Sequence, residues 1–177
     1  MTPERAKLLS ELIEEMTVKD KGFIPREAWT AVQQAFNLPY IELAVAKRVG
    51  TEWCMLLDYR SDEYWRGWHI PGGLWRAPWS IQEACAHLAK SELIDANIVA
   101  RKEIMTYKWP DHPYGNVISH VVICSTLDSI PEIKGKREFF SEVPDDIVNH
   151  HGDFMKACFE WLKRQNNEGV NKEKCRR

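Results

Sequence analysis

The sequence contains no apolar run that approaches the roughly 20 residues needed to cross a bilayer. Its first five residues already carry charge, and no apolar core of a signal peptide follows them. The formal net charge is -2, so the composition gives no support for general binding to nucleic acid. These absences predict a protein that neither crosses a membrane nor binds nucleic acid.

The sequence also lacks a paired cysteine motif. Its five cysteines are an odd number, and no two of them form a C-x-x-C pair. Four of the five lie among apolar neighbours, where cysteine usually acts as a small hydrophobic residue. This usage predicts a reducing compartment, and therefore a cytoplasmic location.

No internal repeat and no linker divides the 177 residues, which are enough for one domain with a substantial core. Apolar residues make up 44% of the chain and charged residues 28%, which is typical of a globular protein. We expect a single domain over residues 1–165, which includes an N-terminal helical extension over 3–22. The polar segment 166–177 is expected to be a disordered tail.

Hydrophobic periodicity divides the chain into helices and strands. Helices are expected over residues 3–16, 25–36, 81–93 and, beginning at Pro144, up to about residue 163. Strands are expected over residues 40–48, 53–59, 68–70, 98–109, 117–126 and 138–141. The helix 81–93 has a defined start, because Ser80 and Glu83 have the spacing of a capping box. The order of elements predicts one α/β domain with a mixed sheet between helices.

The most informative stretch is Pro71-Gly72-Gly73, which is followed by the helix 81–93. We expect the glycine pair to form a turn, and glycine allows the backbone to approach a ligand closely. Near the end of the helix, Glu92 falls in the row of core-facing positions. It is either a half-exposed glutamate at the rim of the core, which is common, or a ligand of a cation. In the second case, glycine carbonyls and this carboxylate surround a hard cation that holds the phosphates of a ligand.

This stretch resembles a Nudix box, whose pattern is G-x5-E-x7-R-E-U-x-E-E-x-G-U. With Gly73 as the first glycine, only one of the four acidic positions is acidic here, at Glu92. The other positions of the box carry Trp79, His87, Leu88, Ser91 and Ile94. The pattern is more similar to that of the GDP-mannose mannosyl hydrolases, whose box also has the leucine and keeps only the last glutamate of the E-E pair. The resemblance covers roughly residues 23–164.

The resemblance implies a Nudix-type α/β/α sandwich with a mixed sheet, here with an extra N-terminal helix. It also implies a hydrolase of a nucleoside-diphosphate derivative, such as a GDP-mannose-like nucleotide sugar, that uses Mg²⁺ or Mn²⁺. Gly72, Gly73 and Glu92 are the implied metal ligands, and Glu92 and His87 are the catalytic candidates. In the family, a glutamine and a histidine on a later loop complete the site. The corresponding residues 130–138 contain neither, so no general base is identified.

Aromatic and histidine side chains are candidates for binding the ligand. Trp75 either stacks on a base or sugar or fills a dimer contact, which makes a homodimer a candidate assembly. Tyr107 and Trp109 either form an aromatic wall for a nucleobase or belong to an ordinary strand end. His120 lies within an apolar strand, where it either contacts the ligand or is a packed, hydrogen-bonded histidine.

Two further groups are expected at the surface. His150 and His151 are adjacent, and side chains of adjacent helical residues point about 100° apart, so we expect them on a helix surface and not as a metal pair. Lys134, Lys136 and Arg137 form a basic loop, which either meets phosphates or is simply solvated.

The pattern leaves two functions open. One is a divergent Nudix hydrolase, and the other is a catalytically inactive Nudix-fold domain that binds a nucleotide-type ligand or a protein partner. The missing carboxylates and base favour the second function, whereas the glycine pair and Glu92 favour the first. We take the hydrolase as the working hypothesis, because the branch that the chain resembles works with a similarly depleted box.

Overall fold

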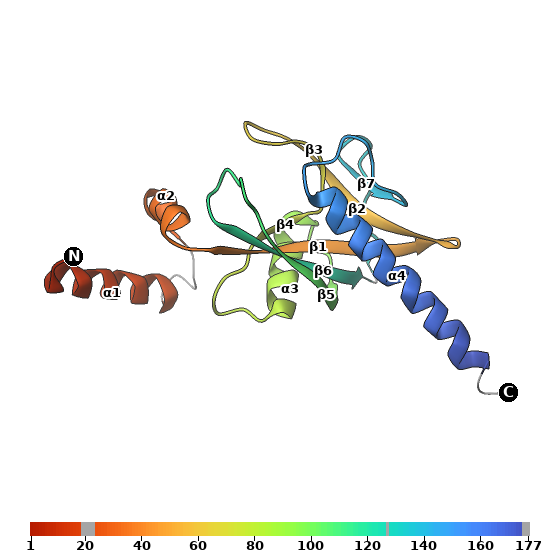
Figure 1. Cartoon of the computed structure of the whole chain (residues 1–177), viewed down its shortest axis with the longest axis horizontal. Helices are drawn as coiled ribbons and strands as arrows, with labels where there is room; N and C mark the ends of the chain where they lie inside the picture. Colours follow the sequence, from red (N-terminus) through yellow and green to blue (C-terminus); the bar gives the residue numbers. More distant parts are fainter. Residues whose placement is uncertain (19–23, 127, 175–177) are drawn as a thin grey trace.

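The computed structural model describes residues 1–18, 24–126 and 128–174, which form four helices and seven strands (Figure 1). The helices are α1 (Pro3–Val18), α2 (Arg26–Ala35), α3 (Ile81–Glu92) and α4 (His151–Lys174). The strands are β1 (Leu38–Val49), β2 (Glu52–Ser61), β3 (Arg66–His69), β4 (Gly72–Leu74), β5 (Ile98–Lys108), β6 (Val117–Thr126) and β7 (Arg137–Phe140). The mixed α/β class and the extra N-terminal helix are confirmed.

Strand β1 is the centre of the sheet. It runs parallel to β6 and antiparallel to β2, and the strand order is β3-β2-β1-β6-β5. Two short strands branch from this path, since β4 pairs with the first part of β1 and β7 pairs with β2. The sheet is therefore mixed, and its central parallel pair needs cover on both faces.

That cover comes from α3 on one face and α4 on the other. Successive side chains of a strand point to opposite faces. Leu43 and Val45 of β1 join the apolar cluster that contains Leu88 of α3. Ala44, from the same strand, joins the cluster that contains Phe154 of α4. The two clusters on either side of one sheet make the predicted α/β/α sandwich.

The capping box predicted at the start of α3 is present. The Glu83 backbone N–H donates to Ser80 Oγ at 3.3 Å, and the Ser80 backbone N–H donates to Glu83 Oε2 at 2.8 Å. The two bonds satisfy donors that the first helical turn leaves unpaired. The helix therefore starts at a defined residue, which also fixes the position of Glu92 at its last turn.

The glycine pair lies in strand β4 and not in the turn that the sequence predicted. Gly72 is paired with Glu42 of β1, and Gly73 is paired with Ile41. A Cβ added at Gly72 would lie 2.4 Å from the Ile41 carbonyl oxygen, and one added at Gly73 would lie 2.7 Å from Leu88 Cδ2. Close packing of β4 against the β1 backbone therefore requires glycine at position 72, whereas a side chain at position 73 would need Leu88 to move.

Helix α4 begins at His151 and not at Pro144. The residues before it pair with β3, because the Trp68 backbone N–H donates to the Asp146 carbonyl at 2.7 Å and the Val148 N–H donates to the Trp68 carbonyl at 2.8 Å. These bonds hold the segment in an extended course along β3. The later start brings His151 into the interior.

Helix α4 continues to Lys174, so the backbone of 166–174 is helical where the sequence predicted a disordered tail. The segment contains no proline, and polarity alone does not end a helix. Residues 175–177, and residues 19–22 of the predicted N-terminal extension, lie outside the described residues. No helix in the described ranges combines the length and apolarity that a bilayer crossing requires.

Candidate functional site

A narrow cleft lies where β1, the β3–β4 segment, the loop after β5 and the start of α4 meet. Its free volume is about 60 Å³, which is room for a few water molecules or one polar end of a ligand. Seven of the side chains that line it are ionisable: Tyr40, Glu42, Arg60, His69, His112, Tyr114 and His151. So many ionisable groups around so small a volume mark this cleft as the candidate functional site.

Glu42 is the acidic residue of the cleft, and it is only 6% exposed. Its Oε1 accepts a hydrogen bond from Ser119 Oγ at 2.6 Å, and that hydroxyl accepts one from Trp109 Nε1 at 2.8 Å. Oε2 lies beside Gly72, where an added Cβ would be 2.5 Å from it. Burial raises the pKa of Glu42 to about 7, against the opposing effects of the Ser119 bond and of Arg60. Glu42 can therefore exchange a proton near neutral pH.

The three histidines of the cleft are neutral at pH 7. The Ile70 backbone N–H donates to Nδ1 of the buried His151 at 3.2 Å, and burial lowers the pKa of His151 well below its usual value. Burial also lowers the pKa of His112 to about 4. His69 Nδ1 lies 2.8 Å from the Asp58 carbonyl, to which it donates, and burial lowers its pKa as well. These rings offer hydrogen bonds to a ligand but no charge.

Arg60 is the cation of the cleft lining. Its guanidinium donates to the Tyr114 hydroxyl at 3.0 Å and pairs with Asp62. The cleft lining also includes the aromatic rings of Trp65 and Trp109, which pack edge-on with 5.8 Å between their ring centroids. A guanidinium beside aromatic rings suits a ligand that combines a phosphate with a planar or apolar part.

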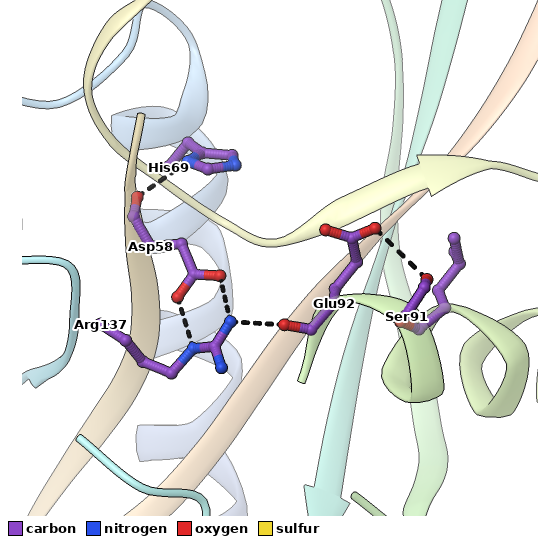
Figure 2. A network of polar contacts seen from close by, with 6 residues as sticks. Asp58, His69, Ser91, Glu92 and Arg137 are labelled. Atoms are coloured by element: carbon purple, nitrogen blue, oxygen red, sulfur yellow. Dashed lines mark hydrogen bonds and ion pairs between the residues drawn. The ribbon is translucent and has the colours of Figure 1, made fainter. Parts of the chain in front are cut away.

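Glu92 lies at the exposed end of α3, outside the cleft lining (Figure 2). Its Oε1 is 3.3 Å from Ser91 Oγ, and its backbone carbonyl accepts from the Arg137 guanidinium. The same guanidinium donates twice to the Asp58 carboxylate, at 2.6 Å each, and the Asp58 carbonyl accepts from His69. Figure 2 shows these residues as one polar network, which connects the end of α3 with a histidine of the cleft.

Glu92 is not part of a cluster of carboxylate, thiol or imidazole ligands that would hold a resident ion among the described residues. Across the described residues, no group of three or more His, Cys, Asp or Glu side chains could hold a metal. Mg²⁺, however, keeps several waters and is commonly bound through one or two carboxylates and the phosphates of a substrate. The Glu92 carboxylate and the backbone carbonyls of Gly72 and Gly73, which the sequence predicted as ligands of such an ion, remain a prediction. Such an ion, when bound, would neutralise diphosphate charge.

The predicted ligand-binding aromatics do not converge on the cleft. Trp109 lines it, with its indole bonded to Ser119. Tyr107 packs instead on Phe154 and His150 at the start of α4, with ring centroids 5.4 and 4.7 Å away. This is the packed strand end that the sequence left open as the alternative for Tyr107.

Three other predicted residues lie away from the cleft lining. Trp75 meets His120 edge to face at 5.2 Å, and His120 pairs with Glu103 at 2.8 Å. The structure therefore brings Trp75 and His120 together, beside an acidic partner that the sequence did not indicate. His87 stacks on Trp79 at 4.2 Å on the exposed side of α3, and five residues of helix turn it away from Glu92.

Sequence reasoning missed the ionisable groups of the cleft. The surface position expected for His151 is wrong, because α4 starts there and the residue is buried. Arg137 is neither solvated nor directed at phosphates but is buried against Asp58. One signal was available for Glu42, since Ala44 and Ala46 follow it on the same side of β1 and show that this side is also buried.

The pKa of Glu42 leads to a test on stability. The folded state binds the proton of the Glu42 carboxyl more tightly than the unfolded state does, so protonation of Glu42 stabilises the folded protein. This contribution to the free energy of unfolding is lost as pH rises from about 4.5 through 7. We expect the Glu42→Gln variant to match the wild type near pH 4. It should become more stable than the wild type by about 3 kcal/mol at pH 8, because the shift spans about two and a half pKa units. Urea unfolding across this pH range measures the difference, and a constant difference would refute the assignment.

No protein-family model matches the sequence, and no curated protein matches it. Solved structures do match. A mutT/nudix family protein from Listeria innocua has a TM-score of 0.58 at 16% identity, over 75% of this chain and 96% of that one. The NUDIX domain of Shewanella oneidensis NrtR, complexed with ADP ribose, has a TM-score of 0.56 at 11% identity, over 78% and 99%. A UDP-X diphosphatase has a TM-score of 0.55 at 15% identity, over 93% and 82%. At these identities the likeness establishes the fold, and this chain has the Nudix fold.

Proposed function

We propose that this protein is a divergent Nudix hydrolase of a nucleoside-diphosphate derivative, specifically a nucleotide sugar similar to GDP-mannose, assisted by Mg²⁺ or Mn²⁺. The observation that carries the proposal is the position of Glu42. A buried carboxyl group with a pKa of about 7 lies at the junction of a polar cleft and the glycine pair. It supplies the general base that the sequence alone does not identify.

Glu42 can accept a proton from a water molecule in the cleft as that water attacks the substrate. A base whose pKa lies near the working pH is both available and strong enough for this transfer. The Ser119 hydroxyl holds one carboxylate oxygen, which leaves the oxygen beside Gly72 for the water. The new bond joins the water oxygen to the substrate, the diphosphate leaves with the electron pair, and the proton goes to Glu42.

The attacked atom is the anomeric carbon in this proposal. Attack at this carbon needs a base near the sugar and requires less of the metal than attack at phosphorus, which agrees with the sparse carboxylates around Glu92. The free volume of about 60 Å³ suits the sugar end of the substrate, and Arg60 offers a charge for the adjacent phosphates. Two structural neighbours are a NUDIX domain complexed with ADP ribose and a UDP-X diphosphatase, which also supports a ligand of this class.

A second candidate is a domain that binds such a ligand, or a protein partner, without catalysis. The absence of a three-ligand metal group among the described residues favours it. The contact between the Arg137 guanidinium and the Glu92 backbone carbonyl favours it too, because a fixed positive charge opposes a second cation nearby.

A turnover assay separates the two candidates. Nucleotide sugars and dinucleotides are screened with Mg²⁺ or Mn²⁺ for the wild type, Glu92→Gln, and the exposed control Glu52→Gln at the β1–β2 hairpin. We expect Glu92→Gln to lower kcat/KM at least tenfold, since it removes the one carboxylate that is available to the ion. The control should keep full activity. Thermal stabilisation by a ligand without any turnover would establish the binding domain instead.

A further inference from the structure

A chain of three buried side chains ends at the candidate base. Trp109 Nε1 donates to Ser119 Oγ at 2.8 Å, and Ser119 Oγ donates to Glu42 Oε1 at 2.6 Å. The three residues are 5%, 0% and 6% exposed, so bulk water does not compete for these bonds. The indole of Trp109 is therefore connected to the carboxyl group of Glu42, although the two side chains do not bond directly.

The chemistry of these groups fixes the direction of the chain. An indole N–H can only donate, so the Ser119 oxygen has to accept from Trp109. The one hydrogen of the hydroxyl then points at Glu42 Oε1, and it has no second acceptor among the described residues. A proton on Oε1 would compete with this hydrogen and leave one of the two buried without a bond, which is costly. The proton of the Glu42 carboxyl group therefore belongs on Oε2.

The oxygen Oε2 of Glu42 is open to the cleft. It has no protein donor in the described part of the chain, and the fully enclosed side-chain atoms without a partner are on Gln33 and Trp53 and not on Glu42. Gly72, which lies beside Oε2, lines the cleft. Oε2 is therefore the oxygen that a water molecule in the cleft can reach.

Other titratable groups face Glu42 across the cleft, from β1, β2, β3, the loop after β5 and α4. They are Tyr40, Arg60, His69, His112, Tyr114 and His151. Arg60 lowers the pKa of Glu42 against the effect of burial, and burial holds the pKa values of the three histidines below their usual range. The group of the cleft that exchanges a proton near pH 7 is therefore the Glu42 carboxyl group.

We propose that Trp109 is a positioning residue, which holds the Ser119 hydroxyl toward Glu42 Oε1 and thereby keeps the exchangeable proton on Oε2. This inference deepens the proposed function and rests on it for the consequence in catalysis, because the attacking water has to meet the oxygen that takes its proton. Without the indole donor, the hydroxyl is less polarised and free to turn, so the ionised carboxylate loses stabilisation. The pKa of Glu42 should then rise.

Infrared titration of the full chain measures this pKa without any substrate. The C=O stretching band of protonated Glu42 is the titrating band that the wild type shows and Glu42→Gln lacks. Trp109→Phe should raise its midpoint by about half a pH unit, because Ser119 loses the donor that polarises and holds its hydroxyl. Trp161→Phe is the matched control, since it removes an indole that packs on the same core cluster but lies between β5 and α4, outside the cleft lining. This control should leave the midpoint unchanged.

A Ser119→Ala background tests whether Trp109 acts through Ser119. Ser119→Ala alone should raise the midpoint by about one pH unit, and adding Trp109→Phe should raise it no further. A space that admits water would instead lower the midpoint, since hydration favours the ionised carboxylate. The indole N–H signal of Trp109 in the NMR spectrum of the wild type should titrate with the same midpoint and should stop doing so in Ser119→Ala. This second measurement holds even if Trp109→Phe does not fold.

The catalytic consequence is measured separately. With a substrate from the screen, the rise of the kcat/KM profile should move with the infrared midpoint in each variant. A protein that shows these midpoints but no turnover would end the proposed hydrolase and leave the positioning of the carboxyl group intact. A Trp109→Phe midpoint at or below that of the wild type overturns the positioning role, as does an equal rise with and without Ser119. An indole signal that does not respond to pH, or a wild type without a band that Glu42→Gln removes, overturns it as well.

Discussion

Replacing Arg137 by alanine will lower the free energy of unfolding by about 3–5 kcal/mol, because it leaves a partly buried carboxylate without its partner. The Arg137 and Asp58 side chains are 10% and 17% exposed and form two hydrogen bonds of 2.6 Å. The same guanidinium also pairs with the last carbonyl of α3, at Glu92. This one side chain of β7 therefore links strand β2 with the end of helix α3. Urea denaturation at pH 7 measures the loss.

The control for this experiment is Arg164→Ala, in an exposed i,i+4 pair with Glu160 whose side chains are 75% and 71% exposed. That change should move the free energy of unfolding by less than about 0.5 kcal/mol. The double variant Asp58→Leu/Arg137→Met should recover most of the stability, since apolar side chains of similar volume replace both charges. If Arg137→Ala is as mild as the control, the network is not a structural element of the site.

Replacing Glu42 by glutamine will lower kcat by about 10²–10⁴ while the protein stays folded, because glutamine keeps the shape of the side chain but cannot accept the proton of the attacking water. The kcat/KM of the wild type should rise with pH up to about 7 and then level off, as the carboxyl group ionises. Glu42→Gln should lose this rise. The measurement is the pH profile of turnover on the nucleotide sugar that the screen identifies.

Ser119→Ala is the companion variant. The serine hydroxyl bonds to one oxygen of the Glu42 carboxylate, and this bond lowers the pKa against the effect of burial. Its loss should therefore move the rise of the pH profile upward and lower kcat less than Glu42→Gln does. A Glu42→Gln enzyme with full activity and an unchanged profile would assign the base to another group.

Local patterns were enough to predict the scaffold. The capping box at Ser80 set the start of α3, and hydrophobic periodicity predicted the strand that became β1. The resemblance to a Nudix box predicted the sandwich, although only Glu92 of its acidic positions was present. These features depend on residues that are close together in the sequence, so the hydrophobic periodicity and short motifs predict them directly.

The cleft depends on contacts between distant segments, so the sequence could not reveal it. Glu42 and Ser119 are on strands far apart in the chain, and only the parallel pairing of β1 with β6 brings them together. The position of His151 depends on where α4 begins, which backbone pairing with β3 decides. The glycine pair was assigned to a ligand, but close contact with the β1 backbone already requires a residue without a side chain at Gly72.

The most direct test of the account is a crystal structure of Glu42→Gln soaked with Mn²⁺ and a nucleotide sugar. We expect the sugar in the cleft with its anomeric carbon beside residue 42, the diphosphate at Arg60, and an anomalous Mn²⁺ peak next to the Glu92 carboxylate. A ligand bound at another surface, with only water in the cleft and no ion at Glu92, would contradict the proposed hydrolase and leave the Nudix fold without this active site.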